Sequence, residues 1–189
     1  MQNGRAAAIN DIAISEVQGG VLPEADLDAL AETLMQSVAL GASIGFILPL
    51  GFVQAQAFWQ KLLPAFERGE KRLLVAREAG KIIGTVQLVV DQPANGAHRG
   101  DVVKLMVHPQ GRRKGVAKKL MDAVEALAHR EGKTLLVLDT VTGSPAQTLY
   151  ENQGFTLSGV IPHYAMSTGG VLESTSVMFK VLAGGAGEE

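Results

Sequence analysis

The sequence contains no cysteine, which excludes disulfides, thiolate metal sites and a cysteine nucleophile. It contains no apolar run that approaches the ~20 residues of a membrane-spanning helix. Residues 1–11 lack the basic patch and apolar run of a secretory leader. The formal net charge is only −2, which argues against a general nucleic-acid-binding protein. We therefore expect a cytoplasmic protein that engages neither membranes nor nucleic acids.

The length of 189 residues suffices for one domain with a full core but not for two large ones. We expect this domain to span residues 12–182. Flexible tails are expected at residues 1–11 and at the glycine-rich residues 184–189. The four histidines do not have the spacing of metal ligands, so we expect no metal site.

Apolar periodicity predicts the elements of this domain. Helices are expected at residues 27–38, 52–66, 115–131 and 145–152, and strands at residues 12–17, 73–77, 82–90, 101–108, 134–138, 155–161 and 175–182. Pro64 should kink or split the second helix. The order β-α-α-β-β-β-α-β-α-β-β predicts an α/β (α+β) fold, in which helices cover one mixed sheet.

Basic residues gather between Lys104 and Lys119, although the chain as a whole is slightly acidic. Within this stretch a strand is stopped by Pro109, a basic turn with glycine follows, and an amphipathic helix begins. A helix start has N–H groups without partners and a positive potential, so it favours a phosphate. Gly115 lets the backbone approach closely, and the cations add charge-assisted contacts. The candidate phosphate-binding residues are Arg112, Arg113, Lys114, Gly115, Val116, Ala117 and Lys118.

The same residues also fit a simpler interpretation, a solvated basic turn that caps an ordinary helix. Two other phosphate-binding motifs are excluded. Gly111 is not followed at the required spacing by Gly-Lys-Ser/Thr, so the turn is not a P-loop. The Gly-x-Gly-x-x-Gly fingerprint of dinucleotide-binding proteins is absent.

Three segments together carry a family resemblance. Arg112-x-x-Gly115-x-Ala117 resembles the Arg/Gln-x-x-Gly-x-Gly/Ala signature of the GNAT acetyltransferases. Residues 103–109 resemble the central strand of that family, and residues 149–155 resemble its C-terminal Leu-Tyr-x-x-x-Gly-Phe segment. The three occur in the family's order and spacing. Within the family the chain is most similar to the tabtoxin-resistance acetyltransferases, over residues 41–182.

The resemblance implies the GNAT fold, a mixed and mostly antiparallel central sheet flanked by about four helices. It implies acetyl-CoA as the co-substrate. It also implies that the central strand splays from its neighbour, so that the backbone of Leu105, Met106 and Val107 pairs with the pantetheine arm like an added strand. The N–H of Met106 or Val107 would then face the thioester oxygen as it gains charge. Ser144, where relatives often carry asparagine, would cap the short helix or contact the cofactor.

Tyr150 and Asp139 are the candidate catalytic residues. A phenol with a pKa near ~10 can protonate a departing thiolate with a pKa near ~8.5, so Tyr150 is the candidate general acid. Asp139 closes a buried apolar strand, where a carboxylate is costly unless it serves a site. It would accept the amine proton, directly or through water, or orient a cationic substrate. The alternatives are a core tyrosine and an aspartate that caps the N–H groups of Thr142 or Gly143.

Two segments are candidate walls of the acceptor site. Residues 41–51 are apolar, rich in glycine and free of charge, which is unusual for a surface loop, and residues 42–50 among them are one candidate wall. His163 and Tyr164 lie in a predicted loop between the last two strands, which borders the acceptor pocket in the family that the chain resembles.

The sequence thus predicts an N-acetyltransferase that moves the acetyl group of acetyl-CoA to a primary amine of a small molecule, such as an amino-acid-like metabolite or a toxin. Acetylation of a protein amine is one alternative. A non-catalytic CoA-binding module that senses the cofactor is another. The expected partners are acetyl-CoA and a small amine. An exposed edge strand near the C-terminus allows either a monomer or a homodimer.

Overall fold

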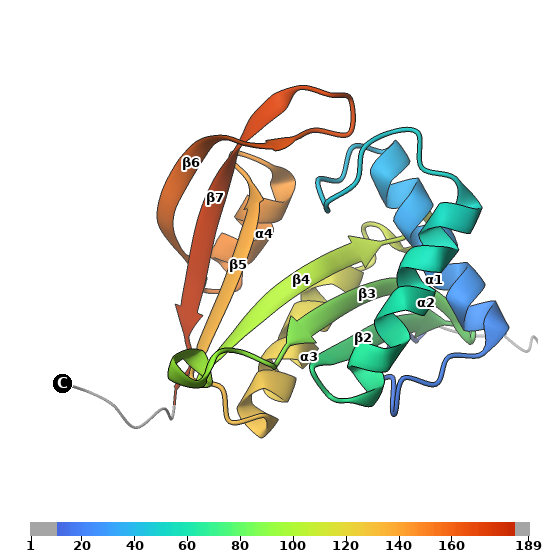
Figure 1. The fold of residues 1–189 in the computed structure, drawn as a ribbon, viewed down its shortest axis with the longest axis horizontal. Coiled ribbons are helices and arrows are strands. Elements are labelled where there is room, and N and C mark those ends of the chain that lie inside the picture. The colour runs from blue at the N-terminus through green and yellow to red at the C-terminus, as the bar shows by residue number, and fades with distance from the viewer. Residues whose placement is uncertain (1–10, 184–189) are drawn as a thin grey trace, which may run out of the picture.

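The computed structural model describes residues 11–183 as one seven-stranded sheet with helices on both faces (Figure 1). The expected tails, apart from Asp11, lie outside these described residues. The strands are β1 (Ala13–Glu16), β2 (Lys71–Glu78), β3 (Lys81–Val89), β4 (Arg99–Val107), β5 (Leu135–Val141), β6 (Thr156–Met166) and β7 (Leu172–Val181). The helices are α1 (Glu24–Ala39), α2 (Phe52–Glu67), α3 (Val116–Arg130) and α4 (Pro145–Asn152), and short 3-10 turns occupy Ala94–Gly96 and Pro109–Gly111.

The sheet has the strand order β1-β2-β3-β4-β5-β7-β6. Five of its six strand pairs are antiparallel, and only β4 and β5 run parallel. That parallel pairing joins only Arg99, Gly100 and Asp101 to Leu135, Leu136 and Val137. Beyond these pairs the two strands spread apart (Figure 1). The predicted order of elements and the mixed, mostly antiparallel sheet are confirmed.

Two apolar cores hold the helices against the sheet. On one face α3 buries Leu120, Val124 and Leu127 against β2, β3 and β4, and on the other α1 and α2 bury Leu34 and Trp59 (Figure 1). Burial of this apolar surface is the main force that fixes the helices on the sheet. It therefore also fixes the start of α3 beside the end of β4.

The observed elements differ from the predicted ones where burial is incomplete. The last two strands are longer than predicted, because β6 is an edge strand with almost every side chain exposed and so lacks an apolar pattern. His163 and Tyr164 consequently lie within β6 and not in a loop. Strand β5 likewise continues past Asp139 to Val141, so Asp139 does not close it.

Pro64 does not split the second helix, and that alternative was wrong. Helix α2 runs continuously over Phe52–Glu67 with Pro64 inside it. The proline lies in the last turn, where its missing N–H removes only one helical hydrogen bond. Its own carbonyl still accepts from Arg68 N at 3.0 Å.

Helix α3 approaches the sheet closely at Gly84 on β3. A Cβ atom there would lie 2.9 Å from Val116 Cγ1 and 3.1 Å from the carbonyl oxygen of Met106. We expect Gly84→Ala to lower the free energy of unfolding by about 1–3 kcal/mol, because the added methyl overpacks this contact. Urea denaturation measures the change. Gly159→Ala is the matched control, since its Cβ would meet nothing within 4 Å; equal losses in the two variants would contradict the prediction.

Candidate active site

The start of α3 has the features of an anion site. Gly115 precedes the helix in the left-handed conformation, with φ 75°, and no side chain caps the helix there. Arg113, two residues earlier, also has a positive φ of 58°. The N–H groups of the first helical turn are thus left for a ligand, at the positive end of the helix dipole. A phosphate satisfies both features.

The four cations of this turn are not equivalent. Lys114 Nζ donates to both carboxylate oxygens of Glu78 on β2, at 2.9 and 2.8 Å. Lys118 Nζ donates to Asp122 one helical turn later, at 2.7 Å. Arg112 and Arg113 are exposed, and within residues 11–183 the structure records no ion pair for either. The two arginines are therefore the side chains available to an anion.

The next two residues of the turn contribute mainly backbone. Val116 is buried, and its side chain packs toward Gly84 in the core under α3. Ala117 is half-buried and small. Neither side chain obstructs the N–H groups at the helix start. Both residues can therefore offer their N–H groups to a bound phosphate.

Strand β4 carries a bulge next to the point where it leaves β5. Met106 pairs with Thr85 and Val103 with Gln87, so Lys104 and Leu105 together face a single residue of β3. Lys104 takes a positive φ of 56°. A bulge bends its strand and turns a side chain in a new direction.

Of the three predicted pantetheine-binding residues, Leu105 lies in this bulge, and Met106 and Val107 follow it. Met106 is buried on the face covered by α1 and α2, whereas Leu105 and Val107 pack on the α3 face. The paired segment of β4 and β5 ends at Asp101. The edge of β4 that points toward β5 is therefore unpaired at all three residues, as an added extended chain requires.

Tyr150 lies on α4 and is 8 % exposed. Its ring packs against Phe155, with centroids 6.0 Å apart. Burial, with a smaller contribution from the Asp139 carboxylate, raises the pKa of Tyr150 to about 12. The phenol is therefore a weaker acid than the sequence alone suggests, and it keeps its proton throughout the neutral range.

Asp139 is exposed on β5, opposite Val177 of β7. It lines a cavity of about 340 Å³ between the diverging strands, together with Asp101, Val103 and Tyr164. Its charge acts on Tyr150, so the structure brings the two candidate catalytic residues within electrostatic reach of each other. Tyr164 reaches this cavity from β6.

Asp101 is a cavity residue that the sequence analysis did not single out. Its carboxylate accepts from Gln92 Nε2 at 3.0 Å and from Arg99 Nε at 3.2 Å. The available signal was a carboxylate at the start of a predicted strand whose other residues are mostly apolar. Because β4 and β5 are paired at Asp101 and spread beyond it, only the topology shows that Asp101 and Asp139 share one cavity.

Ser144 caps α4. Its Oγ accepts from Gln147 N at 3.3 Å and lies 3.3 Å from Thr140 Oγ1 at the end of β5. The cap fixes the start of the helix that carries Tyr150.

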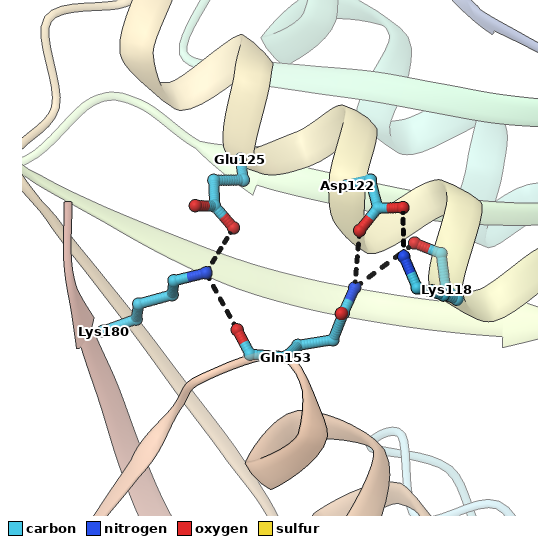
Figure 2. Close-up of polar contacts among 5 residues, drawn as sticks. All are labelled: Lys118, Asp122, Glu125, Gln153 and Lys180. Carbon is cyan, nitrogen blue, oxygen red and sulfur yellow. Dashed lines mark hydrogen bonds and ion pairs between the residues drawn. The ribbon is translucent and has the colours of Figure 1, made fainter. Parts of the chain in front are cut away.

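A polar network joins α3 to α4 and β7 (Figure 2). Lys180 Nζ donates to Glu125 Oε2 at 2.6 Å and to the carbonyl oxygen of Gln153 at 2.8 Å. Gln153 Nε2 in turn donates to Asp122 Oδ1 at 2.9 Å. Asp122 also accepts from Lys118, and that hydrogen bond is the main reason why its pKa is lowered. The network holds Tyr150, three residues before Gln153, in a fixed position relative to the start of α3.

Two loops meet across the open side of the sheet. The segment that joins α1 to α2 contains the apolar residues 42–50, and Leu48 N donates to the carbonyl oxygen of Thr168, in the turn between β6 and β7, at 3.1 Å. In the same segment Phe46 packs edge-on against Phe58 of α2, with centroids 5.0 Å apart. The two loops approach each other on one side of the sheet (Figure 1).

Two classes of feature are not found in the described residues. Within residues 11–183, no three His, Cys, Asp or Glu side chains are grouped as a metal site would need. In the same range, no helix combines the length and the apolar character needed to cross a bilayer.

Comparison with known proteins identifies relatives of the chain. A model described as the "Acetyltransferase (GNAT) family" matches residues 46–155. The chain is 30% identical over 135 residues to an "Uncharacterized N-acetyltransferase in hisH-hisA intergenic region" of Azospirillum brasilense, which covers 69% of this chain and 76% of that protein. It is 39% identical over 89 residues to N-acetyltransferase 8 of Rattus norvegicus, over 45% of this chain and 39% of the relative. Among solved structures, yncA of Salmonella typhimurium with its cofactor acetyl-CoA superimposes with a TM-score of 0.72 at 21% identity, over 94% of this chain and 98% of that one.

Proposed function

Because the chain belongs to the acetyltransferase (GNAT) family, we propose that it moves the acetyl group of acetyl-CoA to the primary amine of a small molecule. The observation that carries this proposal is the arrangement of the cleft. An uncapped helix start with two available arginines lies at one end of β4, and the unpaired edge of that strand leads to a cavity with two carboxylates. The related yncA structure, which contains acetyl-CoA, supports the same choice of co-substrate.

Both backbone groups and side chains would bind acetyl-CoA. The N–H groups of residues 115–117 and the guanidinium groups of Arg112 and Arg113 bind the diphosphate of CoA. The unpaired edge of β4 binds the amides of the pantetheine arm. The N–H of Met106 or Val107 stabilises the negative charge that develops on the thioester oxygen.

Asp139 and Tyr150 would handle the two protons of the reaction. The acceptor must lose a proton before its nitrogen can attack the thioester carbon, and Asp139 accepts that proton directly or through water. The carbon–sulfur bond then breaks, and Tyr150 donates its phenolic proton to the departing thiolate. The nitrogen, which still carries one proton too many after the attack, returns that proton to the Tyr150 phenolate, directly or through water. Asp101 lines the same cavity, but its carboxylate is paired with Arg99, so Asp139 is the carboxylate that would attract a cationic amine.

A small acceptor fits the space that the chain provides. The cavity of about 340 Å³ is near the lower end of the range for small-molecule sites. The loop before α2 and the turn between β6 and β7 are tied together by the hydrogen bond from Leu48 N to the carbonyl oxygen of Thr168. An amino-acid-like metabolite or a toxin of the tabtoxin type is therefore the favoured acceptor class.

The proposal is tested by thiol release from acetyl-CoA across a panel of amines that includes amino acids, polyamines, aminoglycosides and lysine-containing peptides. We expect turnover with a subset of the small amines. Turnover confined to peptides or protein termini would favour the protein-acceptor alternative. Tight CoA binding without turnover on any amine would favour the non-catalytic sensor and contradict the proposal.

A further inference from the structure

We propose that Lys104 selects acceptors that carry a carboxylate close to the reacting amine, which makes the favoured substrate an α-amino acid or a close analogue. The inference rests on the acetyl transfer proposed above and names the substrate class of that same site.

Lys104 is held in an unusual conformation beside the cavity. It occupies the bulge of β4 with a positive φ of 56°. A positive φ strains the backbone of a residue that carries a side chain, so the surrounding structure must hold Lys104 in this conformation. The preceding residue, Val103, lines the cavity with Asp101 and Asp139.

The contacts of the Lys104 ammonium leave it without a carboxylate partner. Nζ donates to the carbonyl oxygen of Ile44 at 2.7 Å and lies 5.9 Å from the ring centroids of both Phe46 and Phe58. Within residues 11–183 no ion pair is recorded for it. An ammonium has three donors, so a ligand carboxylate can bind alongside Ile44.

Burying the Lys104 ammonium without an anionic partner costs free energy, and the lowered pKa of this group reflects that cost. Burial lowers the pKa of Lys104, and the nearby charge of Lys71 lowers it further, whereas Asp139 acts in the opposite direction. A bound carboxylate would favour the charged lysine and offset the loss of hydration.

The two ends of the site are complementary to an α-amino acid. Asp139 would supply negative charge for the ammonium of the acceptor, and Lys104, which follows the cavity residue Val103 and feels the charge of Asp139, would supply positive charge for its carboxylate. Asp101 and Arg99 also line the cavity, and their charges are paired with each other. Gln87, which pairs with Val103 across the sheet, is 1 % exposed, and its Nε2 has no hydrogen-bond partner in the described part of the chain. It offers a further donor on the strand next to the bulge.

A purely structural role for Lys104 makes a different prediction. If the side chain only tethered Ile44 and the aromatic pair, its removal would weaken the binding of every acceptor alike. If it binds the acceptor carboxylate, its removal would penalise amino acids and spare their amides. The ratio of kcat/KM for an acid to that for its amide separates these roles, because differences in intrinsic amine reactivity cancel between variants.

The experiment compares wild type, Lys104→Met and Lys104→Arg with the matched control Lys61→Met, an exposed lysine on α2. For the best amino acid of the panel and its amide, we expect Lys104→Met to lower the acid-to-amide ratio of kcat/KM about 10- to 100-fold, the effect of losing one charge-assisted contact. The loss should appear mainly in KM. Lys104→Arg should restore most of the preference, and Lys61→Met should leave the ratio unchanged.

Each other result overturns the inference. An equal fall for the acid and the amide would assign Lys104 to tethering, and an unchanged ratio would leave it no part in recognition. Wild-type protein that prefers the amide would contradict the inference even if Lys104→Met failed to fold. Absence of turnover with every amine would overturn the acetyl transfer itself, whereas turnover without acid preference would leave that transfer intact.

Discussion

Replacing Tyr150 by phenylalanine is expected to lower kcat about 100-fold or more, which is the lower range for loss of a general acid. The substitution removes only the hydroxyl and leaves the ring to pack against Phe155. In the wild type, the pKa of Tyr150 of about 12 is above the pKa of a free thiol, so proton transfer from Tyr150 to an ordinary thiolate would be energetically unfavourable. A thiolate that forms in the same buried place is also destabilised by lost hydration, which raises its own pKa and offsets the mismatch.

The measurement is steady-state kinetics together with the Kd of CoA. We expect that Kd to change little, because Tyr150 acts on the departing thiolate and not on the diphosphate. The pH profile adds a second readout. A group that must be protonated and has a pKa of about 12 is fully active below about pH 11, so wild-type kcat should show no loss between pH 7 and 10 that arises from Tyr150. A Tyr150→Phe variant with near-normal kcat would remove Tyr150 from the chemistry.

Reversing the charge of both arginines in the basic turn before α3, in the variant Arg112→Glu/Arg113→Glu, is expected to raise the Kd of CoA at least about 100-fold. Each charge-assisted contact contributes about 1.5–3 kcal/mol, and two of them account for more than a factor of 100 before the new repulsion is added. Titration calorimetry measures the Kd. Wild-type affinity should fall as salt rises, and that dependence should be weaker in the variant.

The structure also predicts which cations of the turn matter less. Lys114 is held by both oxygens of Glu78, so Lys114→Ala should raise the Kd of CoA only about threefold or less, as expected for a cation whose charge is already paired. Lys61→Glu on α2 controls for the change in net charge. Equal effects of Arg112→Ala, Arg113→Ala and Lys114→Ala would show that the ion pair with Glu78 opens when the ligand binds.

The sequence predicts best what depends on neighbouring residues. The order of elements follows from apolar periodicity because five of the seven strands (β2, β3, β4, β5 and β7) and all four helices contain buried apolar residues. The basic turn at residues 112–118 is also predictable from the sequence, because its cations, its glycine and the amphipathic helix that follows are adjacent in the chain. The bounds of α4, from Pro145 to Asn152, agree because proline marks the first turn of a helix.

What the sequence does not predict depends on strand pairing. The exposed edge strand β6 has no apolar alternation, so its length was underestimated and Tyr164 was assigned to a loop. The bulge at Lys104 arises from the register between β3 and β4, which no local pattern encodes. Asp101 becomes a cavity residue only because β4 leaves β5 directly after it.

The proposed co-substrate site and the proposed acceptor site differ in how their residues are distributed along the chain. The residues that would bind the co-substrate follow one another along β4, the turn and the start of α3. The proposed acceptor site would instead combine side chains from β4, β5, β6 and β7 with Lys104, which contacts the loop before α2. Mutations that change the shape of the proposed acceptor site would therefore fall mostly outside residues 105–118, the segment that would bind the acetyl donor. During evolution, substitutions in this architecture could therefore change the acceptor specificity while the binding of the acetyl donor is retained.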